Sequence, residues 1–269
     1  MEHLNYCRQM TKQFAKAIAI PSFPAMNRRV LSHAMDLAQA SQKFLLPEGG
    51  RLYDDPEFRA LDESEPLKLP YPFIALEYSR RGMSENEYGE KSTKVILLAR
   101  ERDDAIVVMP ISWIDHMEMW GPLPEAAIPR VGYLDRAMVV DGRTAIKIGL
   151  VNDEIPVSDY ADEIGALLCF LNVLQCKNVH VERSEPKTTG HKIKTALPFD
   201  AYHVLTIDVP GKIGDGAATF GHRSPREHLR RGHIRRLADG KRVWVNATVV
   251  AAGRGAGVVT KDYALRGIV

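Results

Sequence analysis

The sequence lacks a cysteine framework, a signal peptide and a long apolar run. Its three cysteines, Cys7, Cys169 and Cys176, are an odd number without a CxxC spacing, which argues against a disulfide-stabilised secreted fold and favours a reducing compartment. The N-terminus has no unbroken apolar run followed by a small-residue cleavage site. The longest apolar stretch, residues 164–174, is too short to cross a bilayer and contains Asn172. We therefore expect a soluble, cytoplasmic protein with no membrane partner.

Nucleotide-binding signatures are also missing. The glycine-rich stretch 211–221 does not contain the GxxxxGK[ST] phosphate loop, and its glycines do not follow the dinucleotide fingerprint. We therefore expect no cofactor. With 269 residues, 45% hydrophobic and 26% charged, the chain is long enough for one large domain or two small ones with a proper core.

The periodicity of apolar residues predicts an α+β fold, with N-terminal helices, a mostly antiparallel sheet of hairpins and one later helix. Three segments are expected: a helical segment over residues 1–46, an α+β core over 47–183 and a basic β-hairpin module packed on that core over 184–269. Helices are expected over residues 6–20, 25–44 and 159–174, the first two forming an αα-hairpin. Strands are expected over residues 73–78, 93–100, 105–111, 136–140, 145–150, 179–182, 202–209, 229–237 and 241–250.

Positive charge is concentrated near the C-terminus. The 21 residues from His222 to Arg242 contain eight basic residues and two acids, Glu227 and Asp239, a net charge of +6, whereas the rest of the chain sums to −4. Such segregation costs stability through self-repulsion unless something uses it. Seven of the eight basic residues are arginines, and the planar guanidinium fork of arginine matches phosphate oxygens. Asp239-Gly240 between two apolar runs predicts a two-residue hairpin turn.

This charge predicts a nucleic-acid-binding surface, with RNA favoured over DNA. Trp244 on the second strand would offer a face on which a base can stack, and a loop with Lys192 and Lys194 would extend the surface. On a regular strand, cations would lie on both faces, so part of the segment is expected to be an arm over the surface. The predicted binding residues are His222, Arg223, Arg226, Arg230, Arg231, Arg235, Arg236, Lys241, Arg242, Trp244, Lys192 and Lys194.

Two other hypotheses for this segment remain open. The first is a solvated edge strand whose charges protect against aggregation. The second is a metal-independent ribonuclease, with His228 and His233 as general acid and base and arginines stabilising the phosphorane. No metal site is expected, because no cysteine or aspartate cluster accompanies the histidines and the surrounding charge opposes a divalent cation.

The run HRSPREHLRRGHIRRLADGKRVWVNATVV, with the preceding YHVLTIDV and CKNVHVERSEP, resembles a C-terminal module of largely uncharacterised proteins encoded by phages and prophages. The resemblance covers residues 168–263, and its specific part is the PREHxRRGHxR…WV pattern. It implies a phage-type protein acting in the cytoplasm of an infected bacterium. It also raises an alternative function, a regulator or defence inhibitor that binds a host or phage protein through an acidic surface of that partner. The sequence leaves the oligomeric state open.

Overall fold

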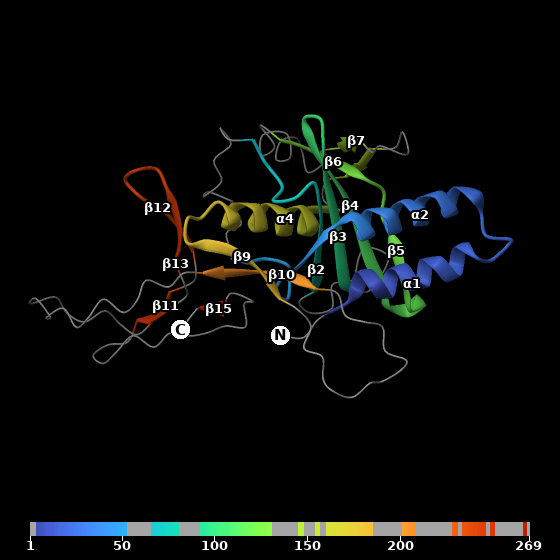
Figure 1. Cartoon of the computed structure of the whole chain (residues 1–269), viewed down its shortest axis with the longest axis horizontal. Helices are drawn as coiled ribbons and strands as arrows, with labels where there is room; N and C mark the ends of the chain where they lie inside the picture. The colour runs from blue at the N-terminus through green and yellow to red at the C-terminus, as the bar shows by residue number, and fades with distance from the viewer. Residues whose placement is uncertain are drawn as a thin grey trace, which may run out of the picture.

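The protein has an α+β fold in which helices lie on both faces of one mixed, mostly antiparallel sheet (Figure 1). The computed structural model describes residues 4–52, 66–80, 92–130, 145–147, 154–156, 160–184, 201–207, 228–230, 233–245, 248–250 and 266–267. Its helices are α1 (Tyr6–Ile18), α2 (Ala25–Ala40), α4 (Ala161–Leu174) and the short 3-10 helix η1 (Asp115–Met117). None of these helices is long and apolar enough to span a bilayer.

The main sheet contains nine strands in the order β15-β10-β1-β2-β3-β4-β5, with β9 beside β10 and β6 beside β4. β1 is parallel to both neighbours, β2 and β10. One edge of β4 pairs with β3, and the other is shared by β5 and β6. The main-sheet strands are β1 (Gln42–Leu45), β2 (Phe73–Ser79), β3 (Ser92–Arg102), β4 (Ala105–Ile114), β5 (Met119–Pro122), β6 (Ala126–Pro129), β9 (Val179–Ser184), β10 (Tyr202–Ile207) and β15 (Arg266–Gly267).

In the described part of the chain, three further two-stranded ladders lie outside this sheet. They are formed by β7 (Ala145–Lys147) with β8 (Glu154–Pro156), by β11 (His228–Arg230) with β14 (Thr248–Val250), and by β12 (His233–Arg236) with β13 (Arg242–Val245). All three are antiparallel.

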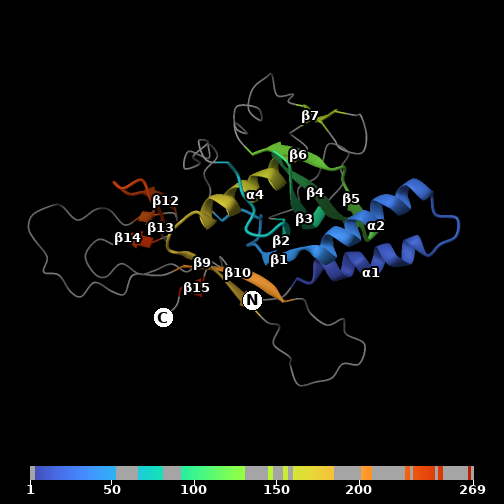
Figure 2. The same cartoon turned by 45° about the horizontal axis from the view of Figure 1, so that its top comes forward.

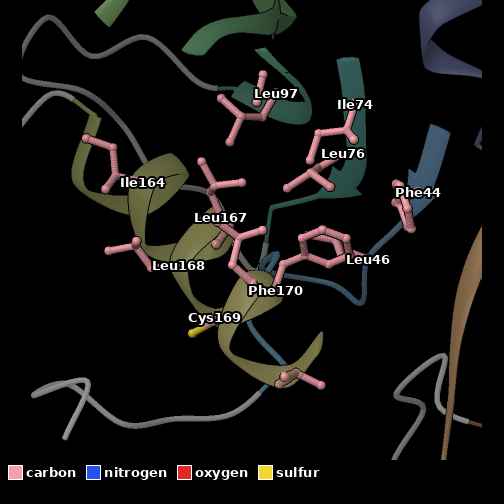
Figure 3. Close-up of a cluster of buried hydrophobic side chains, with 14 of the residues drawn as sticks. Phe44, Leu46, Ile74, Leu76, Leu97, Ile164, Leu167, Leu168, Cys169 and Phe170 are labelled. Carbon is pink, nitrogen blue, oxygen red and sulfur yellow. The ribbon is translucent and has the colours of Figure 1, made fainter. Parts of the chain in front are cut away.

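The larger core fills the space between the sheet and α4 (Figure 3). α4 is apolar around most of its circumference, and its side chains from Ile164 to Val173 are buried, as expected of a helix covered on several sides. The rings of Phe44 on β1 and Phe170 on α4 meet edge to face, with centroids 4.8 Å apart. Burying an aromatic of this size is worth several kcal/mol, about 3–5 kcal/mol when it is truncated to alanine.

A second core lies on the opposite face, under α1 and α2. Because successive residues of a strand point to opposite sides, Ile74 and Leu76 of β2 belong to the core beneath α4, whereas Ala75 belongs to the core beneath α1 and α2. α1 contributes Tyr6, Met10 and Phe14 at helical spacing.

One carboxylate is fully buried between these layers. Glu77 of β2 has no exposed surface, and its two oxygens accept hydrogen bonds from the backbone N–H groups of Tyr6 (2.8 Å) and Cys7 (3.0 Å) at the start of α1. The Tyr202 hydroxyl of β10 donates to the same carboxylate at 2.6 Å and accepts from the Asn5 N–H at 2.6 Å. Burial raises the pKa of Glu77, although these hydrogen bonds act in the opposite direction. The carboxylate thus joins α1, β2 and β10.

Acidic residues also occupy the start of α4. Asp162 pairs with Arg51 at 3.0 Å, and the buried Glu163 pairs with Arg80. These anions lie in the first turn of the helix, where the helix dipole favours negative charge. The two ion pairs attach α4 to the segments that follow β1 and β2.

The α+β class, α1, α4, the hairpin of β3 and β4, and strands β2, β9 and β10 confirm the sequence predictions. The helix predicted over residues 25–44 is wrong beyond Ala40, because the backbone is extended at Ser41 and Gln42–Leu45 form β1. The hairpin predicted between residues 136–140 and 145–150 falls largely outside the described residues. Its described part, β7, pairs with β8. The main sheet takes strands from all three predicted segments.

Candidate nucleic-acid interface

The described part of the basic segment belongs to a hairpin, β12 with β13, that lies at the opposite end of the molecule from α1 and α2 (Figures 1 and 2). β12 and β13 pair from His233–Val245 to Arg236–Arg242. Arg230 lies three residues before His233, and Thr248 lies three residues after Val245. Arg230 and Thr248 also pair with each other, in β11 and β14. The two ladders therefore have the same register, and the prediction of a hairpin between residues 229–237 and 241–250 is confirmed for its described parts.

The hairpin turn differs from the prediction by one residue. The Gly240 N–H donates to the Leu237 carbonyl at 3.0 Å, and the Leu237 N–H donates to the Lys241 carbonyl at 2.7 Å, which leaves a three-residue loop, Ala238 to Gly240. Only Gly240 in this loop has a positive φ, at 79°. A three-residue loop with glycine in the left-handed region is the common alternative to the two-residue turn. The predicted turn residues are therefore correct in identity, but the loop length is wrong.

Asp239 and Lys241 stabilise this loop. The Lys241 backbone N–H donates to Asp239 Oδ1 at 3.1 Å, and Lys241 Nζ lies 3.0 Å from Asp239 Oδ2. The hydrogen bonds from Lys241 lower the pKa of Asp239 below its ordinary value. The only acid in this loop is therefore ionised at neutral pH and offsets part of the local positive charge.

The inner face of the hairpin is anchored to the end of α4 and the following turn. The Trp244 side chain is only 5% exposed and belongs to the core beneath α4, with Ile234 packed against that core. The Trp244 backbone N–H donates to Asn178 Oδ1 at 2.8 Å, and Asn178 Nδ2 donates to the Trp244 carbonyl at 3.0 Å. The Lys177 N–H donates to the Arg242 carbonyl at 3.0 Å. These contacts fix the direction in which the hairpin projects.

Arg242 is part of the same anchor. Its guanidinium donates to Asn172 Oδ1 at 3.0 Å and to Gln175 Oε1, and the residue is 7% exposed. The assignment of Arg242 and Trp244 to the binding surface is therefore corrected, since a phosphate contact or a stacked base needs an accessible side chain. The sequence gives no indication that these two side chains are buried, because their partners lie on and after α4.

The exposed cations of the described hairpin are Arg235, Arg236 and Lys241. His233 is half-buried on the first strand. The structure adds exposed Lys177 to this end of the molecule, and its charge acts on Asp239 in the hairpin loop. Lys177 could not be predicted from the sequence as part of this surface, because it precedes the hairpin by more than fifty residues.

The other predicted residues are located less fully. His228 and Arg230 are placed by the backbone pairing of β11 with β14, opposite Val250 and Thr248. His222, Arg223, Arg226, Arg231, Lys192 and Lys194 lie outside the described residues. Among the residues that the structure describes, no group of three or more His, Cys, Asp or Glu side chains could hold a metal ion.

A separate polar cluster, not predicted from the sequence, joins α2 to the sheet. The buried Glu125 carboxylate accepts from Arg100 on β3 at 2.9 Å and lies 2.8 Å from His33 Nε2 on α2. Glu125 also lines an open pocket of about 220 Å³ beside the turn between β3 and β4, with Arg102 and Asp103 among its other lining residues. Since Glu125 is already bonded on two sides, the cluster is a structural tie between α2, β3 and the residue preceding β6.

Function is inferred from the geometry and charge of the chain's own residues. Comparisons with protein-family models, with curated proteins and with solved structures gave no match.

Proposed function

We propose that this phage-type protein binds nucleic acid, RNA in preference to DNA, by contacts of the basic hairpin with the phosphate backbone. The observation that carries the proposal is the anchored hairpin, which exposes Arg235, Arg236 and Lys241 while Trp244 is buried in the core. Phosphate contacts supply most of the sequence-independent affinity for nucleic acid.

Anchoring supports binding because it reduces the conformational freedom lost when the complex forms. The β13 backbone is bonded to Lys177 and Asn178, and Arg242 is bonded to α4. A hairpin held in this way does not have to be ordered by its ligand, and preorganised surfaces bind more tightly for the same contacts. Since Trp244 is buried, the proposal depends on charge and not on base stacking at that residue.

The test is fluorescence-anisotropy titration of labelled single- and double-stranded RNA and DNA at two salt concentrations. We expect binding that weakens with salt, because each neutralised phosphate releases counterions. In Arg235→Ala/Lys241→Ala the slope of log Kd against log salt should fall by about 1 for each lost contact. The matched control is Lys68→Ala/Arg102→Ala, which removes one lysine and one arginine, both exposed, from a distant part of the surface.

The result that overturns the proposal is an absence of binding at low salt, or an equal loss in the hairpin variant and in the control. The two alternative functions have their own readouts in the same preparation. A ribonuclease should lose cleavage in His228→Ala and His233→Ala while retaining most of its affinity. A regulator that binds protein should retain its partner from bacterial lysate after nuclease treatment.

A further inference from the structure

Positive charge is concentrated at the N-terminal end of the sequence as well as in the hairpin. Residues 1–35 contain five basic residues and one acid, whereas residues 36–221 contain 20 basic residues and 30 acids. The strongly acidic middle of the chain therefore separates two basic segments. The N-terminal basic segment, residues 1–35, contains α1 and most of α2.

The cations of α1 form a stripe opposite its buried face. Arg8, Lys12 and Lys16 follow one another at intervals of four residues, which places them along one side of a helix. Lys12 and Lys16 are exposed and Arg8 is half-buried. Met10 and Phe14 point to the opposite side, into the core against the sheet. We call Arg8, Lys12 and Lys16 the α1 stripe.

The α1 stripe lowers the stability of the helix that carries it. Like charges four residues apart on a helix repel each other. No acidic residue occurs between Leu4 and Met35, so α1 contains no acidic side chain that could pair with Lys12 or Lys16. A cost that the helix does not offset locally is expected where the charge has a use.

The turn between α1 and α2 is held in a fixed shape. The Arg28 guanidinium donates to the carbonyls of Ile18, Ile20, Pro21 and Phe23, at distances from 2.5 to 3.0 Å. These bonds hold the turn at the C-terminal end of α1, the helix that carries the exposed Lys12 and Lys16.

The α1 stripe and the basic hairpin belong to opposite ends of the molecule, with the sheet and α4 between them (Figures 1 and 2). We infer that the α1 stripe is a second contact for the phosphate backbone of nucleic acid, so that one molecule bridges two nucleic-acid segments. This inference rests on the function proposed for the hairpin. Two surfaces separated by the body of the protein can each contact a different nucleic-acid segment. One short segment would have to pass around the protein to contact both.

The experiment uses the full-length protein and two RNA duplexes of different sequence. One duplex is attached to a surface and loaded with protein, and the second, fluorescent duplex is then added. The variants are Lys12→Glu/Lys16→Glu and the milder Lys12→Gln/Lys16→Gln, which keeps good helix-forming residues. The matched control is Lys68→Glu/Arg102→Glu. Circular dichroism and thermal melting show that each variant is folded.

We expect the wild type and the control to retain the second duplex. The glutamate variant should load on the first duplex but retain roughly tenfold less of the second, as expected when two phosphate contacts become repulsive. The inference is overturned if the wild type loads without retaining the second duplex, or if both α1 variants retain it as well as the wild type. If neither the wild type nor the control loads on the first duplex, the function proposed for the hairpin is overturned, and the inference with it.

Discussion

Removal of the buried carboxylate by Glu77→Ala should destabilise the protein severely. The substitution removes the acceptor of four donors: the N–H groups of Tyr6 and Cys7, the hydroxyl of Tyr202 and the thiol of Cys7. Each buried donor left unpaired costs about 1–3 kcal/mol, and one missing partner in a buried charged network costs about 3–5 kcal/mol. Because these donors share one carboxylate, their costs are not additive. We expect a loss of about 3–5 kcal/mol in the free energy of unfolding.

Urea denaturation followed by circular dichroism measures this loss, with exposed Glu48→Ala as the control. Tyr202→Phe removes a single hydroxyl that both donates to Glu77 and accepts from Asn5, so it should cost less, about 1–3 kcal/mol. If Glu77→Ala were no less stable than Glu48→Ala, the hydrogen bonds at the start of α1 would contribute nothing to stability, and the reasoning would be refuted.

The pH dependence of this site has an unusual sign for a carboxyl group. Desolvation raises the pKa of Glu77 in the folded state above its ordinary value of 4.5. The pKa of Glu77 is therefore ordinary in the unfolded state and raised in the folded state. Between these two pKa values the folded state binds more protons than the unfolded state, so the contribution of Glu77 to stability falls as the pH rises. Relative to Glu77→Gln, which does not titrate, the wild type should therefore lose stability as the pH rises above about 4.5. Urea midpoints of both proteins across that range measure the difference, and a wild type that gains stability relative to the variant would contradict the raised pKa.

Three substitutions test the backbone and the hairpin anchor. Gly50→Ala should cost more than 2 kcal/mol, since Gly50 has a φ of 71° and an added Cβ would lie 2.8 Å from the ring of Tyr78. Gly240→Ala should cost only about 1 kcal/mol, because its φ of 79° is strained but no atom lies within 4 Å of the added Cβ; equal urea midpoints for the two variants would contradict this difference. Asn178→Ala removes both bonds to the Trp244 backbone and should accelerate amide exchange in β13, whereas unchanged exchange would mean that core packing of Trp244 holds the hairpin without them.

Local patterns predicted the helices and the longer strands, but they missed the short strands β1, β5, β6, β8 and β15. β1 shows why. Residues 42–45 follow α2 directly, and Phe44 extends the apolar pattern of the helix. Their extended conformation depends on β2 and β10, which pair with them from residues 73–79 and 202–207. Such long-range pairing overrides local propensity in a segment of only four residues.

The candidate site was predictable in its charge and only partly in its geometry. The count of arginines and the Asp239-Gly240 pair located the hairpin, but the burial of Arg242 and Trp244 depends on α4, some seventy residues earlier in the chain. Glu77 gave even less signal, because a glutamate in a strand usually occupies a solvent-facing position. Its burial follows from the docking of α1 on that face.

The central position of β1 has a consequence for synthesis of the chain on the ribosome. β1 leaves the ribosome about 160 residues before its neighbour β10, since Phe44 pairs with His203. During that interval β1 can pair with β2, but its other edge displays unpaired backbone groups, and an open edge recruits strands from other chains. Until β10 is made, the Glu77 carboxylate also lacks its bond from Tyr202. A nascent chain paused or truncated before residue 200 should therefore be the form of this protein most prone to aggregate.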